Sequence, residues 1–314
     1  MMKIGLIGLG QISRQHITAI QRLDGLELKA VSDVDKSRDP KILGVNFFVD
    51  YHKMFNDKGI DAVAIATPNY LHAPMSIEAL RKGKHVLVEK PMTTNLEDAQ
   101  SMIEAAKSSS KVLVVAYHFQ FMPEIQYFLQ TKKKYGRIKS FEAHFTCPIE
   151  YAEGWRLTKE LSGGGVCIDN GVNVLSVLRL FIPDLNIIRA TFEYEQRNKI
   201  KDPLVEDFVE IDFKCNDISG KVVVDWRSQN KAQYKTKLRT SRGEIILEHL
   251  ADDQFVNTMS YEGRIVYKGQ EDRYLDIYKD FIRRVNQADS NATQAFEDLR
   301  MVINAYKRYG KIQR

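Results

Sequence analysis

The sequence predicts an α/β protein with two domains, a doubly wound parallel sheet followed by an α+β region with mainly antiparallel strands. The 314 residues are about twice the usual length of one domain. Short apolar runs alternate with helical patterns up to about residue 120, which is typical of βαβ units. Period-two runs then take over, as in half-buried antiparallel strands. We therefore place the domains at 1–120 and 121–314, and leave open whether the terminal helix packs back on the first domain.

The elements of the first domain are assigned from short apolar runs and from apolar residues at helical spacing. Helical patterns begin at Ile12 and cover Ala73–Arg81 and Leu96–Ala106. Because parallel βαβ connections are right-handed, we expect helices on both faces of the sheet. The predicted strands are Lys3–Ile7, Leu26–Val31, Ala62–Ala66, His85–Val88 and Val112–Val115.

The second domain is predicted from strands in which apolar and polar residues alternate. Helical patterns follow these strands at Tyr274–Val285 and Ala295–Tyr309. The predicted strands are Phe141–Phe145, Ala190–Tyr194, Val205–Phe213, Gly220–Val224, Lys235–Leu238 and Glu244–Leu247.

Composition excludes several classes of protein. Hydrophobic residues make up 44% of the chain and charged residues 28%, and the net charge of +5 is too small for a nucleic-acid-binding protein. No run approaches the roughly 18 apolar residues of a membrane helix. Cys147, Cys167 and Cys215 are widely spaced, and the histidines lack paired-ligand spacing. We therefore expect no disulfide framework, no metal site and a reducing, cytoplasmic location.

A glycine loop follows the first predicted strand. Gly8-Leu9-Gly10-Gln11-Ile12-Ser13 has the form GxGxx followed by a small residue, between a strand and a helix. Gly8 permits a tight turn, Gly10 lets the backbone approach a pyrophosphate, and the helix N-terminus presents amides to the phosphates. This context predicts a Rossmann dinucleotide site that includes Gln11 and Ile12. A plain glycine turn is the alternative.

Asp33 closes the second predicted strand, about 25 positions after the glycine loop. Its carboxylate can accept hydrogen bonds from an adenosine ribose, and its negative charge repels a 2′-phosphate. We therefore expect NAD to be preferred. Arg38 lies nearby in the sequence and can pair with a phosphate, so NADP stays open. The alternative is that Asp33 is a solvated residue.

A lysine follows the fourth predicted strand, in the sequence Glu89-Lys90-Pro91. Thr67-Pro68-Asn69 ends the preceding strand in a similar position, and His72 follows it. Ligands of open α/β sheets bind along the carboxyl edge of the strands. We therefore expect cofactor contacts from Thr67, Pro68, Asn69, His72, Glu89 and Lys90.

Glu89-Lys90-Pro91, with Thr-Pro-Asn-x-x-His upstream, resembles the glucose–fructose oxidoreductase/inositol dehydrogenase (Gfo/Idh/MocA) family of nicotinamide-dependent sugar oxidoreductases. The resemblance spans essentially the whole chain. It implies a Rossmann domain and a C-terminal α+β domain with a large, open, mainly antiparallel sheet. It also implies that Lys90 is catalytic and positions the substrate, that Glu89 lies near the nicotinamide, and that the chain forms a homodimer or homotetramer.

A second motif lies in the segment 162–178, where Asp169 and Asn173 are four residues apart and so share one face of a helix. The alternative is that Asp169 caps this helix after the preceding glycines. Most members of the family carry histidine where Asn173 stands. Asparagine cannot exchange a proton near neutral pH. Proton transfer then falls to Lys90, with or without tuning by Asp169, or to a water.

Asp-x-Gly-x-Asn-x-Leu-Ser-x-Leu, starting at Asp169, resembles the branch of aldose 1-dehydrogenases that act on L-arabinose and D-galactose. Ala116-Tyr117-His118 resembles the same branch and implies that His118 binds the sugar. The segment 147–161 matches this branch poorly. Glu150, Trp155 and Arg156 are the candidate sugar contacts there.

These residues predict an NAD(P)-dependent dehydrogenase acting on a CH–OH group of a sugar. In its most specific form the hypothesis is an aldose 1-dehydrogenase, which oxidises the C1 hydroxyl of a pyranose to the aldonolactone. The alternatives are a relative acting on an inositol, a nucleotide-linked sugar or a sugar phosphate, and a non-catalytic regulator that binds the cofactor. The expected catalytic residues are Lys90, Asp169 and Asn173, and the expected sugar contacts are Lys90, His118, Trp155, Arg156, Asp169 and Asn173.

Overall fold

The structure is a computed structural model that describes residues 1–148, 154–194, 205–229, 231–250, 256–270 and 272–310. The chain folds as two compact units. The first contains Met1–Tyr117 and Asp272–Leu299, and the second contains His118–Glu271 and Arg300–Arg314. The continuous ranges 1–120 and 121–314 differ from this division, because a late segment returns to the first unit. That grouping depends on contacts between distant residues, which local periodicity does not show.

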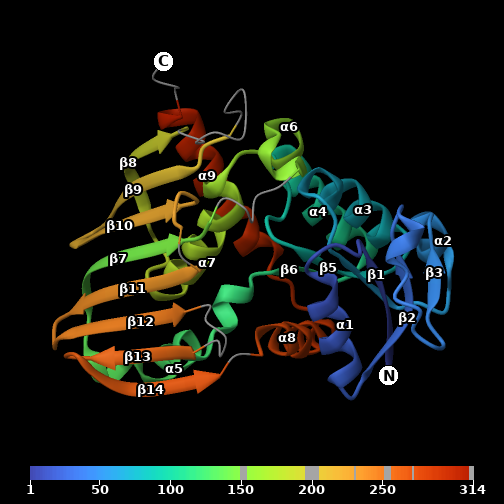
Figure 1. The fold of residues 1–314 in the computed structure, drawn as a ribbon, viewed down its shortest axis with the longest axis horizontal. Helices are drawn as coiled ribbons and strands as arrows, with labels where there is room; N and C mark the ends of the chain where they lie inside the picture. Colours follow the sequence, from blue (N-terminus) through green and yellow to red (C-terminus); the bar gives the residue numbers. More distant parts are fainter. Residues whose placement is uncertain (149–153, 195–204, 230, 251–255, 271, 311–314) are drawn as a thin grey trace. The chain divides into compact units, whose positions relative to one another are not determined.

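The first unit is built on a six-stranded parallel sheet in the order β3-β2-β1-β4-β5-β6. The strand order reverses at β1, which lies between β2 and β4, and such a switch point is where doubly wound sheets bind ligands. Figure 1 labels these strands. Their bounds are β1 Met2–Ile7, β2 Leu26–Ser32, β3 Asn46–Phe48, β4 Ala62–Ile65, β5 His85–Glu89 and β6 Leu113–Ala116.

The predicted strands of this sheet are confirmed to within about two residues. Strand β3 was not predicted, because its three residues are too few to show an alternating pattern. Helix α1 packs against α8, and α3 packs against α4. Strands β1, β4, β5 and β6 are buried almost throughout, as expected of a parallel sheet covered on both faces. The helices are α1 Ser13–Arg22, α2 Tyr51–Asn56, α3 Asn69–Arg81, α4 Leu96–Ser109 and α8 Arg273–Gln287.

The returning segment also closes the edge of this sheet. β6 is an edge strand, and the Asn291 side chain bonds both backbone groups of Val115, at 2.8 Å to the N–H and 2.9 Å to the carbonyl. Ser290 donates its hydroxyl to the Leu113 carbonyl. These bonds replace those that a further strand would make, and so protect an otherwise open edge.

The second unit holds an eight-stranded sheet in the order β14-β13-β12-β11-β7-β10-β9-β8. It is mainly antiparallel, as predicted, with one parallel pair between β7 and β10. Strands β13 and β14 are additions to the prediction, and β14 lacks alternating burial. The bounds are β7 Ile138–Thr146, β8 Asn186–Glu193, β9 Phe208–Cys215, β10 Ile218–Asp225, β11 Gln233–Thr240, β12 Glu244–Leu250, β13 Val256–Tyr261 and β14 Arg264–Gln270.

The two faces of this sheet differ. Phe141, Ala143 and Phe145 of β7 point into the core and are buried, whereas the alternate residues from Ser140 to Thr146 are polar. Helix α5 (Pro123–Thr131) packs against β12, β13 and β14, as Figure 1 shows. Helix α7 (Val172–Phe181) packs against α5. The terminal helix α9 (Ala292–Tyr309) starts in the first unit and continues from Arg300 in the second.

Candidate functional site

The glycine loop of the first unit has the geometry that a pyrophosphate requires. Gly8 has φ +91°, and a Cβ there would lie 2.5 Å from the Ala66 carbonyl oxygen, so a side chain is excluded. Gly10 is exposed, and apart from its own atoms and those of its two chain neighbours no atom of the described residues lies within 4 Å of the position that its Cβ would take. Helix α1 begins without a side-chain cap and without an acid in its first turn. The loop therefore fits a nucleotide diphosphate.

Asp33 lies directly behind this loop and is buried. Its Oδ2 accepts a hydrogen bond from the Leu9 N–H at 2.8 Å, and its Oδ1 accepts one from the Asp35 N–H at 2.9 Å. The guanidinium of Arg38 lies 3.5 Å from Oδ2. Asp33 thus shapes the glycine loop, and Arg38 stands beside it with half of its side chain exposed. Asp33, which would repel a 2′-phosphate, and Arg38, which could bind one, therefore lie side by side.

His72 joins the carboxyl ends of β4 and β5. Its Nδ1 lies 2.8 Å from the Pro91 carbonyl oxygen, and its Nε2 lies 2.9 Å from that of Thr67. Burial lowers the pKa of His72, and the two carbonyls oppose this effect in part. Asn69 begins α3 and is buried, and the Lys90–Pro91 peptide bond is cis. His72 therefore fixes the two loops that carry the predicted cofactor contacts.

Glu89 is the last residue of β5 and lies in a buried hydrogen-bond network. Its Oε1 is 3.2 Å from His16 Nε2 and 3.1 Å from the Tyr274 hydroxyl, and its Oε2 accepts from the Lys90 N–H at 3.2 Å. Burial raises the pKa of the Glu89 carboxyl, but the bond and charge of His16 and the charge of Lys90 outweigh burial. The pKa therefore lies below its usual value, and Glu89 is a carboxylate.

The predicted cofactor residues are thus brought together at one sheet edge, after β1, β2, β4 and β5. The sequence interpretation missed His16, Tyr274 and Tyr278, which complete the network around Glu89. A signal was present for His16, which lies on the buried face of α1 with Ser13 and Ala19. A polar residue on such a face requires a buried partner. Tyr274 and Tyr278 gave no local signal, because they lie in α8, far along the chain from Glu89 and His16.

In the second unit, Asp169 and Asn173 lie at the start of α7, but the helix is not regular there. Residues Cys167–Gly171 form a π-helical turn, in which the Val172 N–H bonds to the Cys167 carbonyl. Asp169 lies inside this turn and is not the N-cap, which is Val166. Asp169 is partly exposed and Asn173 is fully buried. Single π turns in helices are frequent at functional sites.

Asn173 is the most informative side chain of this unit. It has no exposed surface, and neither its Nδ2 nor its Oδ1 has a hydrogen-bond partner among the described residues. Leaving buried polar groups without partners costs about 1–3 kcal/mol each. Native proteins rarely leave such groups unpaired without a functional reason. The Asn173 carboxamide is therefore a candidate ligand group.

The glycine segment before Asp169 is held by a buried acid. Glu206 Oε2 accepts from the Gly165 N–H, and its Oε1 accepts from the Cys167 N–H, both at 3.0 Å. The Tyr306 hydroxyl donates to the same carboxyl and accepts from the Ile168 N–H. Burial raises the pKa of Glu206, and these donors lower it in part. The sequence interpretation missed Glu206 and Tyr306, because this anchor joins residues far apart in the chain.

The other predicted sugar contacts lie on two different elements of the second unit. His118 begins the 3₁₀ turn His118–Phe121, which packs against α7, and Gln120 donates to the Ser176 carbonyl at 3.3 Å. His118 is thus on an element adjacent to that of Asn173. The Arg156 guanidinium lies over the Trp155 ring, 4.7 Å from its centroid, and their 3₁₀ turn packs against the short helix Lys159–Ser162. Glu150 lies outside the described residues.

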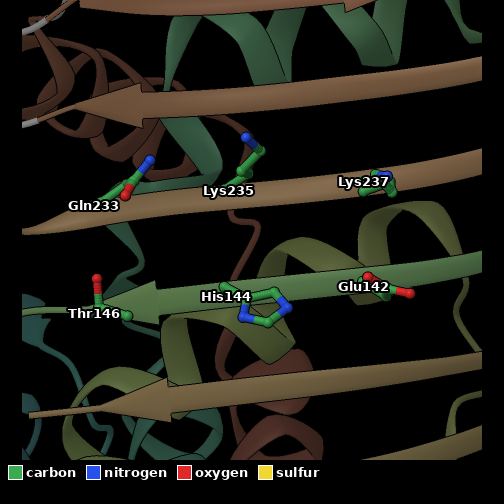
Figure 2. A pocket seen from close by; sticks show the side chains of 6 residues that line it. All are labelled: Glu142, His144, Thr146, Gln233, Lys235 and Lys237. Carbon is green, nitrogen blue, oxygen red and sulfur yellow. The ribbon is translucent and has the colours of Figure 1, made fainter.

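A depression on the polar face of the eight-stranded sheet is a different feature (Figure 2). Lys235 lies 3.2 Å from Glu248, and Lys237 lies 3.2 Å from Glu244, so the two ammonium groups are paired within the sheet. None of the predicted site residues lines it, and we assign it no catalytic role. Its lining residues are Glu142, His144 and Thr146 of β7 and Gln233, Lys235 and Lys237 of β11.

Two further features, a membrane-spanning helix and a metal site, are absent from the described ranges. Over those residues, no helix combines the length and apolarity needed to cross a membrane. The same residues hold no group of three His, Cys, Asp or Glu side chains arranged as a metal ion would require.

Comparison with known protein families gives two matches along the chain. Residues 2–117 match the family described as "Oxidoreductase family, NAD-binding Rossmann fold", and residues 129–246 match the GFO/IDH/MocA C-terminal domain. These two segments coincide with the parallel sheet and with much of the eight-stranded sheet described above.

Curated relatives match over part of their length. A 1,5-anhydro-D-fructose reductase of Ensifer adhaerens is 30% identical over 194 residues, which cover 59% of this chain and 57% of the relative. A glucose-6-phosphate 3-dehydrogenase of Bacillus subtilis is 29% identical over 226 residues, 67% of this chain and 63% of the relative. The chain thus matches little more than half of the length of these relatives.

Solved structures share the fold over nearly the whole chain. A mutant 3-ketoreductase from Actinomadura kijaniata, in complex with TDP-benzene and NADP, has a TM-score of 0.83 at 21% identity, covering 98% of this chain and 97% of its own. Levoglucosan dehydrogenase in complex with NADH and L-sorbose has a TM-score of 0.81 at 20% identity, covering 98% of each chain. At such identities the likeness establishes the fold.

Proposed function

The chain belongs to the Gfo/Idh/MocA oxidoreductase family, and from that premise we propose that it is an NAD(P)-dependent sugar oxidoreductase. The single observation that carries the proposal is the Asn173 carboxamide, fully buried and without a partner among the described residues. A sugar hydroxyl both donates and accepts hydrogen bonds, so it can satisfy the Nδ2 and the Oδ1 of this group. The named activities of the relatives support the same class of reaction.

The nicotinamide cofactor is NAD or NADP. Its pyrophosphate would bind over Gly10 and the free N-terminus of α1, and its ribose would lie beside Asp33 and Arg38. When bound, it accepts or gives a hydride. We propose NAD as the preferred form, because the buried Asp33 carboxylate is held in place by two backbone N–H groups and repels an additional phosphate.

Lys90 is the proposed acid–base residue. It follows β5 directly, at the sheet edge where ligands of this fold bind, and its backbone N–H is held by Glu89. In the oxidative direction its amine takes the proton of the substrate hydroxyl, and in the reductive direction its ammonium returns that proton. His72 holds the carbonyl of the next residue, Pro91, and so limits movement of the Lys90 backbone.

We propose that the substrate hydroxyl is the C1 hydroxyl of an aldose. Asn173 can bind a hydroxyl but cannot exchange a proton, so position 173 supplies no imidazole to share the proton transfer that we assign to Lys90. An anomeric hydroxyl is more acidic than an ordinary secondary alcohol and needs less assistance. His118, on the turn that packs against α7, and Asp169 are proposed to bind further hydroxyls.

A second candidate substrate class consists of sugars oxidised at a ring hydroxyl. It is favoured by the names of the relatives, which include glucose-6-phosphate 3-dehydrogenase and inositol 2-dehydrogenase of Salmonella typhimurium. The test is reduction of NAD and NADP across free aldoses, inositols, sugar phosphates and nucleotide sugars, with product analysis. Lactone from a free aldose supports the first class, and a keto sugar supports the second. Tight cofactor binding without turnover on any of these would indicate a regulator.

We also propose that copies of the chain associate through the polar face of the eight-stranded sheet. Lys235 and Lys237 of β11 and Glu210 and Asp212 of β9 flank β7 and β10 on that face. A two-fold axis along the strands would place β11 of one copy over β9 of the other, with these charges already paired within each sheet, as Lys235 is with Glu248 and Glu210 is with Lys221. Light scattering on the purified protein tests this, and a monomer at micromolar concentration would contradict it.

A further inference from the structure

Three buried side chains of the first unit, those of Tyr278, His16 and Glu89, form a hydrogen-bonded chain that ends at the backbone N–H of Lys90. The His16 Nδ1 lies 2.8 Å from the Tyr278 hydroxyl, and its Nε2 lies 3.2 Å from Glu89 Oε1. A carboxylate only accepts hydrogen bonds, so Nε2 carries a hydrogen whether His16 is neutral or protonated. His16 is 1% exposed and Tyr278 0%, so water does not compete for these bonds.

We propose that Tyr278, His16 and Glu89 form a positioning relay, which couples the phosphate-binding helix α1 to the backbone of Lys90. This inference rests on the proposed oxidoreductase function. His16 lies on α1, one turn after the helix start, and Glu89 ends β5. Glu89 Oε2 in turn accepts from the Lys90 N–H. Cofactor contacts to α1 are thereby coupled, through His16 and Glu89, to the backbone N–H of Lys90.

The surroundings of the relay agree with this role. Tyr274 donates a second hydrogen bond to Glu89 Oε1, and the rings of Tyr274 and Tyr278 contact His16 edge-on, with centroids 4.9 and 5.7 Å away. Burial and the charge of Glu89 raise the pKa of both tyrosines, so they remain neutral hydroxyls. Each oxygen of the buried carboxylate therefore has a donor, and the carboxylate has a single well-defined orientation.

Two substitutions of His16 separate the two ends of the relay. Glutamine places its amide nitrogen near the position of Nε2, so His16→Gln keeps the donor for Glu89 and loses the contact with Tyr278. Asparagine reaches only the position of Nδ1, so His16→Asn loses the donor for Glu89. Only His16→Asn loses a hydrogen bond to the charged Glu89, so we expect the kcat of this variant to fall roughly 10- to 100-fold. We expect less than about a threefold fall for His16→Gln.

A role in packing alone would lower the melting temperature of both variants without separating their kcat values. We expect the two melting temperatures to be similar, the KM for the sugar to be unchanged, and the Kd for NADH to rise only in His16→Asn. In a Glu89→Leu background the two His16 variants should have the same Kd for NADH, because residue 89 then has no side-chain acceptor and the coupling is removed. Tyr234→Phe, which removes a buried hydroxyl bonded to Thr236, is the matched control and should leave the Kd unchanged.

Equal kcat and equal Kd for His16→Gln and His16→Asn would overturn the relay. Persistence of the difference in NADH binding after Glu89→Leu would overturn it as well, since the effect would not pass through the side chain of residue 89. NADH binding is measured by fluorescence without any sugar. A wild-type protein that turns over no sugar would therefore overturn the proposed function, while the NADH measurements still decide on the coupling.

Discussion

Asn173→Leu tests whether the buried carboxamide is reserved for a ligand. Leucine has the same branched skeleton as asparagine and no polar atoms. In most proteins, replacing a buried asparagine by leucine removes hydrogen bonds and destabilises the fold. Asn173 has no such bonds among the described residues, so the substitution removes an unpaired polar group from the core. We expect the unligated protein to gain about 1–3 kcal/mol from this change, before any cost of fitting the larger side chain.

Asn257→Leu is the matched control for this substitution. Asn257 is also fully buried in the second unit, but its Oδ1 is bonded to His249 Nδ1 at 2.8 Å. The same replacement there leaves the histidine without that partner, and we expect it to destabilise by about 1–3 kcal/mol. Because the cost of fitting leucine enters both variants, the comparison isolates the polar contribution. At about 2–4 °C per kcal/mol, Asn173→Leu should melt several degrees above Asn257→Leu.

The assays are thermal unfolding without ligand and steady-state kinetics with the best sugar. Loss of one or two hydrogen bonds to the substrate should lower kcat/KM for the sugar roughly 5- to 100-fold. Equal destabilisation by Asn173→Leu and Asn257→Leu would refute the reasoning, because it would mean that Asn173 is already satisfied in the folded protein. Unchanged kcat/KM in Asn173→Leu would refute its role in substrate binding.

Two further predictions concern the first unit. Lys90→Ala should lower kcat roughly 10²- to 10⁴-fold, the usual contribution of a general base, with the melting temperature little changed, and full turnover in this variant would remove Lys90 from the mechanism. Asp33→Ser should shift the ratio of kcat/KM for NAD and NADP towards NADP, since it removes the charge that repels a 2′-phosphate and leaves Arg38 in place. An unchanged ratio would show that Asp33 serves only to hold the Leu9 amide.

Local pattern predicted the strands that end at the proposed cofactor edge, because each of those strands and turns depends on residues close in sequence. The strands before Gly8, Asp33 and Lys90 are short, apolar and bounded by turn residues, and a parallel sheet brings the carboxyl ends of such strands to one edge. Predicting this edge therefore requires the parallel-sheet rule but no knowledge of contacts between distant residues.

The parts that were missed depend on contacts between distant residues. His16 bonds to residues 73 and 262 positions away, and Glu206 bonds to Tyr306 across 100 positions. The π turn around Asp169 could not be predicted from the sequence. The four-residue spacing from Asp169 to Asn173 is compatible with a regular α-helix and does not indicate a π turn. It arises where Glu206 and Tyr306 bind the backbone amides of the turn.

The return of Asp272–Leu299 to the first unit affects how the protein is made. At about 5–20 residues per second, a ribosome takes roughly eight to thirty seconds to pass from Tyr117 to Asp272. Throughout that interval the nascent parallel sheet lacks Ser290 and Asn291 on strand β6, and Glu89 lacks its tyrosine donor. An unpaired strand edge is a template for pairing with other chains. The half-made chain therefore carries an open strand edge that the finished protein covers, and the N-terminal unit is not complete until Leu299 has been made.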